Sequence, residues 1–188
     1  MIDHHHGTLD RIVDTERRSL RPIGATAYEV AARTGDQLTA LARLPGVLLY
    51  RGVRLAGHAP PIPYALSAGT RLVLVDTVAW PPGSYATTPG GAVLCDTTYI
   101  GQSAHLLLGA VRRLRRLQPR GHRVTAVVVV HPSIAGTLTL PGATGTELTW
   151  THAACAVPTI AHRLRRHRAS PGPSRAQTAL TVATAPLS

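Results

Sequence analysis

The chain has 188 residues, of which 44% are hydrophobic and 4% aromatic, and it carries a formal net charge of +11 at pH 7. This apolar content supports a folded core and excludes a chain that is disordered throughout. No run of about 18 apolar residues occurs, which argues against a membrane span, and the start of the chain lacks a signal-peptide pattern, so we expect a cytoplasmic protein.

The positive charge is concentrated in the second half of the chain. Residues 1–100 contain 9 Arg and 8 acidic residues, whereas residues 101–188 contain 11 Arg and one acidic residue, Glu147. Lys is absent, so Arg supplies the positive charge of the chain. The guanidinium group of Arg can make bidentate contacts with phosphate groups. A genome with GC-rich codons would replace Lys by Arg whatever the function, but it would not gather the Arg residues in one half.

Three segments are expected from composition. Residues 1–23 are predicted to form a tail with a short surface helix, residues 24–168 an α/β domain, and residues 169–188 a disordered tail. The first tail contains the tract His4–His6, and consecutive histidines do not converge on one ion as an i, i+4 helical pair does. We therefore expect this tract to have no physiological metal role.

The first elements surround one central stretch. Apolar residues at helical spacing predict a helix over Ala25–Leu44, which ends at a Pro-Gly pair, and a strand is predicted over Val47–Val53. The stretch Pro61–Trp80 is predicted to form two buried strands folded about a turn at Ser67–Thr70. Asp76 follows the apolar run of the second strand, so we expect its carboxylate at the end of that strand.

A hairpin and a helix are predicted next. The segments Tyr85–Thr88 and Ala92–Cys95 flank a Pro-Gly-Gly turn, which is typical of a hairpin. Thr98–Leu117 has apolar residues on one helical face and Arg residues away from it, and its last turn is strongly cationic, which suits the negative end of a helix dipole. The sequence therefore predicts a long amphipathic helix there.

The last elements indicate the fold class. Val124–Val130 is an uninterrupted apolar run, typical of a strand covered on both faces. Thr137–Leu140 and Glu147–Thr149 are candidate minor strands, and Val157–Arg168 is a predicted final helix. The order strand, helix, strand predicts an α/β fold with a mixed central sheet flanked by helices.

Several classes of chemistry lack support in the sequence. No G-x-S-x-G elbow, P-loop or G-x-G-x-x-G motif occurs, so serine hydrolysis and nucleotide binding are unsupported. Cys95 and Cys155 have no CxxC spacing, which predicts buried free thiols in a reducing compartment, and zinc lacks paired ligands. Magnesium-type phosphodiester chemistry remains, and it needs two or more carboxylates around the metal.

One stretch carries a family resemblance. Ile62, the turn at Ser67–Thr70, the apolar run Leu72–Val75, Asp76 and Trp80 follow one pattern without a gap. This pattern resembles the centre of the NERD (nuclease-related) domain, a branch of the PD-(D/E)XK nuclease superfamily. The resemblance implies a restriction-endonuclease-like core.

The resemblance extends on both sides and covers about residues 24–130. The Gly35-Asp36 pair resembles the Gly-Glu pair of the family's opening helix, and Gln102 occupies the place of a family Gln. The departures affect the chemistry, because Pro63 stands where the family has its first Asp and Val78 where it has its Lys. Asp36 is one methylene shorter than the family's Glu.

These departures predict a catalytically inactive site. Asp76 with Gln102 alone would hold Mg²⁺ poorly, so we expect no cofactor, and Mg²⁺ only if Asp36 or Asp96 completes the site. The alternative role for Asp76 is structural, as an acceptor for backbone amides just after the strand. Pro63 forbids one ladder hydrogen bond, so its strand is expected to be bent or at an edge.

Three functions stay open at this point. The first is binding of nucleic acid through phosphate contacts from Arg112, Arg113, Arg115, Arg116, Arg120, Arg123, Arg163, Arg165, Arg166 and Arg168. The scarcity of aromatic residues favours duplex over single strands. Against this, exposed helix faces are usually charged whatever their function.

The second hypothesis is a scaffold that binds a protein partner or forms a homodimer through the same fold. The third is an active metal-dependent nuclease, whose cleavage Asp76→Ala would abolish.

Overall fold

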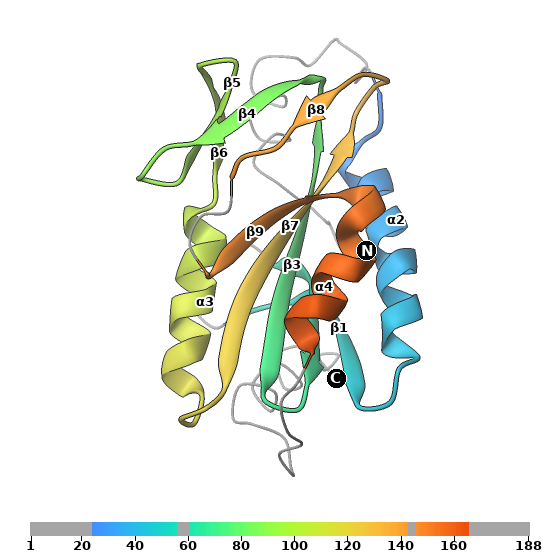
Figure 1. The fold of residues 1–188 in the computed structure, drawn as a ribbon, viewed down its shortest axis with the longest axis vertical. Helices are drawn as coiled ribbons and strands as arrows, with labels where there is room; N and C mark the ends of the chain where they lie inside the picture. The colour runs from blue at the N-terminus through green and yellow to red at the C-terminus, as the bar shows by residue number, and fades with distance from the viewer. Residues whose placement is uncertain (1–23, 56–60, 143–145, 166–188) are drawn as a thin grey trace.

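The computed structural model describes residues 24–55, 61–142 and 146–165. The predictions for the His4–His6 tract, for both tails, and for Arg166 and Arg168 fall outside these residues. The described residues form a layered α/β structure with a main sheet and a smaller second sheet (Figure 1). The predicted α/β class with a mixed sheet is therefore confirmed.

The main sheet has five strands in the order β1-β2-β3-β7-β9. Neighbours from β1 to β3 are antiparallel, and β3, β7 and β9 are parallel. Apolar, β-branched runs build the central strands, as predicted. The strands span Val47–Val53 (β1), Ile62–Ala68 (β2), Arg71–Trp80 (β3), Arg123–Pro132 (β7) and Leu148–His152 (β9).

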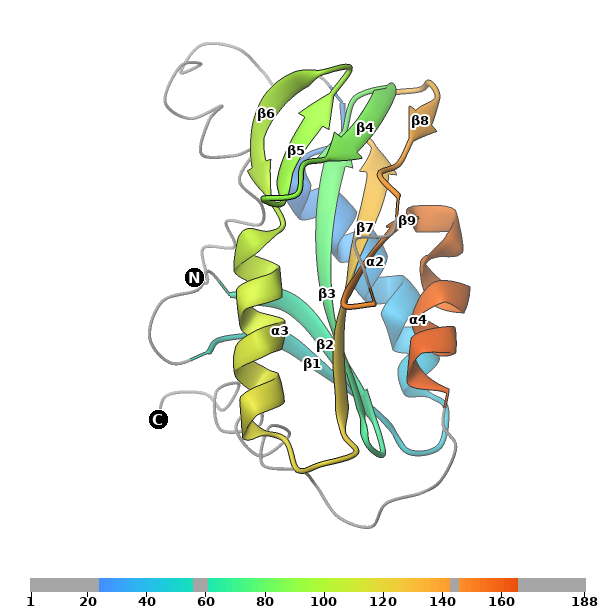
Figure 2. The ribbon, with the colours of Figure 1, turned by 60° about the vertical axis from the view of Figure 1, so that its left-hand side comes forward.

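Helices cover both faces of this sheet. The helix α3 (His105–Leu117) packs on one face, and α2 (Ala27–Ala42) and α4 (Ala156–Leu164) pack on the other (Figures 1 and 2). Even-numbered apolar residues of β3 belong to the α3-side core and odd-numbered ones to the α2/α4-side core, as expected for the two-residue period of a strand. A short 3-10 helix, Ala153–Cys155, precedes α4.

The second sheet lies beyond the carboxyl ends of β3 and β7 (Figure 2). Its order is β6-β5-β4-β8, and the predicted hairpin is confirmed as the antiparallel pair β4 and β5. Together with α3 it encloses one end of the α3-side core. The strands are Gly83–Thr87 (β4), Ala92–Cys95 (β5), Thr98–Ser103 (β6) and Leu138–Thr139 (β8).

The prediction of one helix from Thr98 to Leu117 was wrong in its first part. Residues Thr98–Ser103 form β6, and α3 begins only at His105. Between β5 and β6, Asp96 and Thr97 have φ values of 45° and 76°, and two residues of positive φ are typical of the tight hairpin turn that suits twisted strands. Antiparallel pairing therefore decided the conformation of a segment whose apolar spacing also suits a helix.

Three smaller predictions also need correction. Asp76 lies inside β3, which continues to Trp80, and not at the end of a strand. Cys95 is only half-buried and Cys155 is exposed, so neither free thiol is fully buried in the core. The last helix ends at Leu164, because Arg165 already has a ψ of 139°.

Gly35, in the middle of α2, is needed for close packing. The helix begins with a capping box in which the Thr26 hydroxyl accepts from the Glu29 amide and the Glu29 carboxylate accepts from the Thr26 amide. Further along, a Cβ at Gly35 would lie 2.5 Å from the Tyr64 hydroxyl. That hydroxyl is fixed by donation to the Ala31 carbonyl oxygen at 2.8 Å. A glycine thus lets α2 approach β2.

Gly35→Ala is expected to lower the free energy of unfolding by about 1–3 kcal/mol through this overpacking. The matched control is Gly109→Ala in α3, where an added Cβ would meet nothing within 4 Å. This control is expected to raise the free energy of unfolding by about 0.5–1 kcal/mol through helix propensity. Urea denaturation of both variants measures the difference, and equal effects would contradict the close approach at Gly35.

Candidate nucleic-acid interface and the surroundings of Asp76

Asp76 lies on the α3-side face of the main sheet, between Leu74 and Val78 of the same strand. Its Oδ1 accepts a hydrogen bond from the Thr77 amide at 2.8 Å, which agrees with the structural role considered for this residue. Burial raises the pKa of the Asp76 carboxyl from 3.8 to about 6, and the Thr77 bond lowers it only in part. The carboxylate therefore has an apolar setting, which disfavours its charge.

Pro63 was expected to make its strand bent or to lie at an edge, but β2 lies between β1 and β3 and is not an edge strand. The alternation of its side chains changes at Pro63. Ile62 packs into the α3-side core and Tyr64 into the opposite core, whereas regular alternation would put both on one face. The pairing of β2 with β3 ends at Tyr64 and Val75. Pro63 thus coincides with the point where the two strands stop pairing, immediately before Asp76.

The other residues of the resembled motif serve packing. The Trp80 indole Nε1 donates to Gln102 Oε1 at 2.7 Å, and the Trp80 ring stacks on Tyr85 at a centroid distance of 4.1 Å. Gln102 belongs to β6 and not to the start of a helix. Val78 is buried in the α3-side core. The Gln102 oxygen that a metal would need is therefore already bonded to Trp80.

The two further acidic residues considered for a metal site lie elsewhere. Asp36 is exposed on α2, which covers the face opposite to Asp76. Asp96 lies in the turn of the second sheet, where its Oδ1 accepts from the Ser84 amide at 3.0 Å. In the described part of the chain, no three His, Cys, Asp or Glu side chains are grouped so that they could hold a metal. Among the described residues, neither Asp36 nor Asp96 joins Asp76 to form a carboxylate group of the kind that Mg²⁺ prefers.

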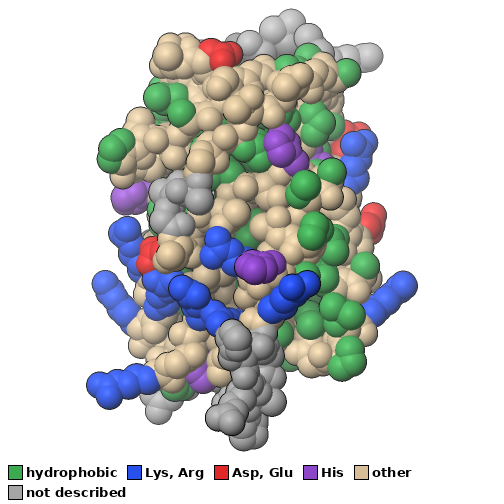
Figure 3. All heavy atoms as spheres, viewed as in Figure 1, with side chains coloured by type: hydrophobic (Ala, Val, Ile, Leu, Met, Phe, Trp, Pro, Cys, Tyr) green, Lys and Arg blue, Asp and Glu red, His purple; other side chains and the backbone are tan. Residues whose placement is uncertain are grey.

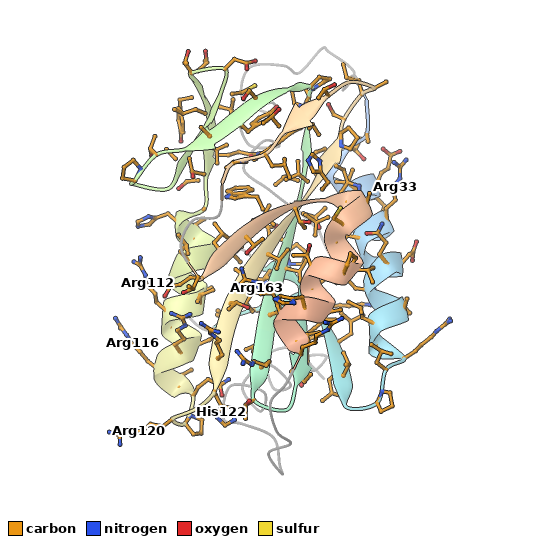
Figure 4. All side chains as sticks on the ribbon, in the orientation of Figure 1. Arg33, Arg112, Arg116, Arg120, His122 and Arg163 are labelled. Carbon is orange, nitrogen blue, oxygen red and sulfur yellow. The ribbon has the colours of Figure 1, made fainter. Side chains whose placement is uncertain are left out.

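The described Arg residues of the second half lie around α3, β9 and α4, and we call this part of the surface the arginine band. They come from α3 and α4, on opposite faces of the sheet, and from the loop and strand between them. Figure 3 shows cations gathered over α3, β9 and α4, and Figure 4 shows Arg112 and Arg116 beside α3, Arg120 below it, and Arg163 between α3 and α4. The described members are Arg112, Arg113, Arg115, Arg116, Arg120, Arg123, Arg163 and Arg165.

The edge strand β9 joins the two helices. From α3, Arg115 pairs with Glu147, and its Nε donates to the Val124 carbonyl oxygen at 3.1 Å. From α4, Arg163 donates to the Thr146 carbonyl oxygen at 3.0 Å and to the Thr149 hydroxyl. Guanidiniums therefore hold the start of β9 from both faces of the sheet, which the sequence did not predict.

The rest of the band is available to solvent. Burial and, to a smaller degree, the charge of Arg123 lower the pKa of the Arg163 guanidinium. Within the described residues, Arg115 with Glu147 is the salt bridge of this region, so Glu147 is already engaged. The exposed members are Arg112, Arg113, Arg116, Arg120, Arg123 and Arg165.

One neighbour of the band was missed. Arg71 begins β3 and lies opposite Arg123, the first residue of β7, in the parallel pairing. It stands alone in the sequence, far from the Arg-rich segments, so no local pattern marked it. Only the register of two strands separated by a helix brings it to the band.

The chain matches no family model, no curated protein and no solved structure. Among the described helices, none has both the length and the apolar character needed to cross a bilayer.

Proposed function

We propose that this protein binds the phosphate backbone of duplex nucleic acid through the arginine band, on a nuclease-related fold that does not cleave it. The observation that carries the proposal is the meeting of guanidiniums from α3, β7 and α4 around β9, where Glu147 is engaged by Arg115. Clustered guanidiniums bind backbone phosphates without reading base sequence.

The order of the elements supports the nuclease-related part. A helix, three antiparallel strands, a second core helix and a parallel strand follow one another from α2 to β7, with the hairpin β4 to β6 inserted before α3. We propose that these elements form a restriction-endonuclease-like core of the NERD type. Buried Val78 in place of a Lys, and Pro63 at the strand bend, support loss of catalysis.

The aromatic residues favour a duplex over a single strand. Trp80 and Trp150 are 0% and 9% exposed, so neither offers a ring for base stacking. The exposed tyrosines Tyr28 and Tyr99 lie on α2 and β6, outside the band. Single-strand binders combine a cationic groove with stacking platforms, whereas the band supplies cations alone.

The test is fluorescence anisotropy with a labelled duplex of mixed sequence at several salt concentrations. If six of the exposed guanidiniums each contact a phosphate, the affinity is expected to fall about a thousandfold between about 50 and 200 mM NaCl. A second duplex of unrelated sequence is expected to bind equally. Absence of binding even at the lowest salt would refute the proposal.

A homodimer is the second candidate. β1 pairs only with β2 within the described sheet, so its other edge is open. Leu44 and Leu48, which lie just before this edge and near its start, are 51% and 56% exposed. Open edges with apolar neighbours can pair with another copy of the chain. Light scattering without nucleic acid separates the candidates, because only the homodimer predicts twice the monomer mass there.

A further inference from the structure

Two Arg side chains lie side by side at the amino ends of β3 and β7. Arg71 and Arg123 are partners in the parallel register. By strand alternation both belong to the face of Val73 and Val127, which is the face covered by α4. Strands lie about 4.8 Å apart, so these two guanidiniums can reach the same small ligand.

A third guanidinium comes from the helix on that face. Arg163 is in the last turn of α4, fixed to β9 through the Thr146 carbonyl oxygen and the Thr149 hydroxyl. It lies close enough to Arg123 for the two charges to interact. Arg163 thus lies near Arg123, which is the register partner of Arg71 at the start of the two strands.

This group has no carboxylate of its own in the described structure. Glu147 is paired with Arg115, which approaches from α3. Like charges held together without a counter-ion favour an anion between them, and guanidiniums can share the oxygens of one phosphate. The Thr149 hydroxyl, which accepts a hydrogen bond from Arg163, already fixes the orientation of that guanidinium.

We propose that Arg71, Arg123 and Arg163 form a seat for one phosphate group of the bound nucleic-acid backbone. This deepens the proposed function and rests on it. The seat differs from the rest of the band in one respect: its three guanidiniums share a single phosphate, whereas those along α3 contact separate phosphates.

The salt dependence of duplex affinity tests whether the three guanidiniums share one phosphate. The slope of log affinity against log salt concentration decreases by about 0.9 for each phosphate that the protein no longer neutralises. For a shared phosphate, Arg71→Gln or Arg123→Gln is expected to reduce the slope by no more than about 0.9, and the double variant to reduce it by that same amount. Neither side chain takes part in the bonds that fix Arg163 to β9, so the variants leave that attachment in place.

The control is Arg43→Gln, which removes one charge from an exposed residue at the end of α2. It is expected to leave the slope unchanged. A decrease of about 1.8 in the double variant would overturn the seat, because it would mean two separate phosphates, while leaving nucleic-acid binding intact.

If the unsubstituted protein binds no duplex, the proposed function fails. Binding of inorganic phosphate then tests whether Arg71, Arg123 and Arg163 form a phosphate site. Thermal unfolding is then followed with and without phosphate at constant ionic strength. A rise in Tm with phosphate that is abolished in Arg123→Gln but kept in Arg43→Gln would support a phosphate site at these residues. An equal rise in all variants, or none in the unsubstituted protein, would overturn it.

Discussion

Replacing Asp76 by Asn is expected to raise the free energy of unfolding by about 2 kcal/mol near pH 8 and to change it little near pH 4. The folded protein raises the pKa of the Asp76 carboxyl from 3.8 to about 6, so ionising this group costs more in the folded than in the unfolded chain. One pKa unit corresponds to about 1.4 kcal/mol, and solvent at the partly exposed Asp76 side chain reduces the expected effect to about 2 kcal/mol.

The sign follows from proton binding. Between pH 3.8 and about 6 the folded state holds the Asp76 proton more often than the unfolded state, so stability is highest below this window and is lost as the pH rises through it. Asn stays neutral and avoids that loss. The free energy of unfolding at each pH is measured by urea denaturation, followed by the fluorescence of Trp80 and Trp150, the two Trp of the chain.

Asp36→Asn provides the control. Asp36 is exposed, so its substitution is expected to change the free energy of unfolding by no more than about 0.5 kcal/mol. A destabilised Asp76→Asn protein at pH 8 would contradict the apolar setting. Plasmid cleavage that requires Mg²⁺ or Mn²⁺ and disappears in this variant would contradict the inactive site and favour the nuclease hypothesis.

The second large effect concerns the arginine band. Substituting Arg112, Arg116 and Arg120 together by Gln is expected to weaken duplex binding about a hundredfold near 50 mM NaCl and to reduce the salt slope by about 2.7. All three side chains are exposed on or just after α3. The core face of α3 is untouched, so the fold is expected to persist.

A second triple variant, which also removes three positive charges, tests whether the position of the charges or only the net charge of the protein determines binding. Arg33, Arg43 and Arg54 are exposed and lie outside the band, and their joint replacement by Gln is expected to weaken binding much less. Anisotropy titrations of both variants at several salt concentrations make the comparison. Equal weakening by both would mean that overall charge, and not the band, attracts the duplex.

The strands β1, β2, β3 and β7 of the main sheet could be predicted because their apolar runs suit a strand better than a helix. β9 was expected only as a minor strand over Glu147–Thr149, and it belongs to the main sheet. Val124–Val130 is too β-branched and too continuous for a surface helix, and it forms the centre of β7. The start of the helix α3 could not be predicted in the same way. Thr98–Ser103 became a strand through pairing with β5 across a two-residue turn, and such pairing is not visible in local spacing.

Most residues of the proposed interface could be named from the sequence, but Arg71 and the arrangement of the others could not. The Arg-rich segments were visible in the sequence, yet the joining of α3 and α4 by β9 depends on bonds of Arg115 and Arg163 over long sequence separations. The role of Gln102 was hidden for the same reason, because its partner Trp80 lies on another strand. Such contacts depend on the strand register and the positions of the helices, which are set only when the whole sheet packs.

The composition of the arginine band also limits how the proposed binding of nucleic acid can be controlled. A guanidinium stays protonated across the physiological pH range, so its charge does not respond to acidification. Acetylation of Lys, a common way to remove surface charge, has no target in a chain without Lys. The proposed binding through these guanidiniums is therefore expected to respond to ionic strength, to competing polyanions and to modification of Arg.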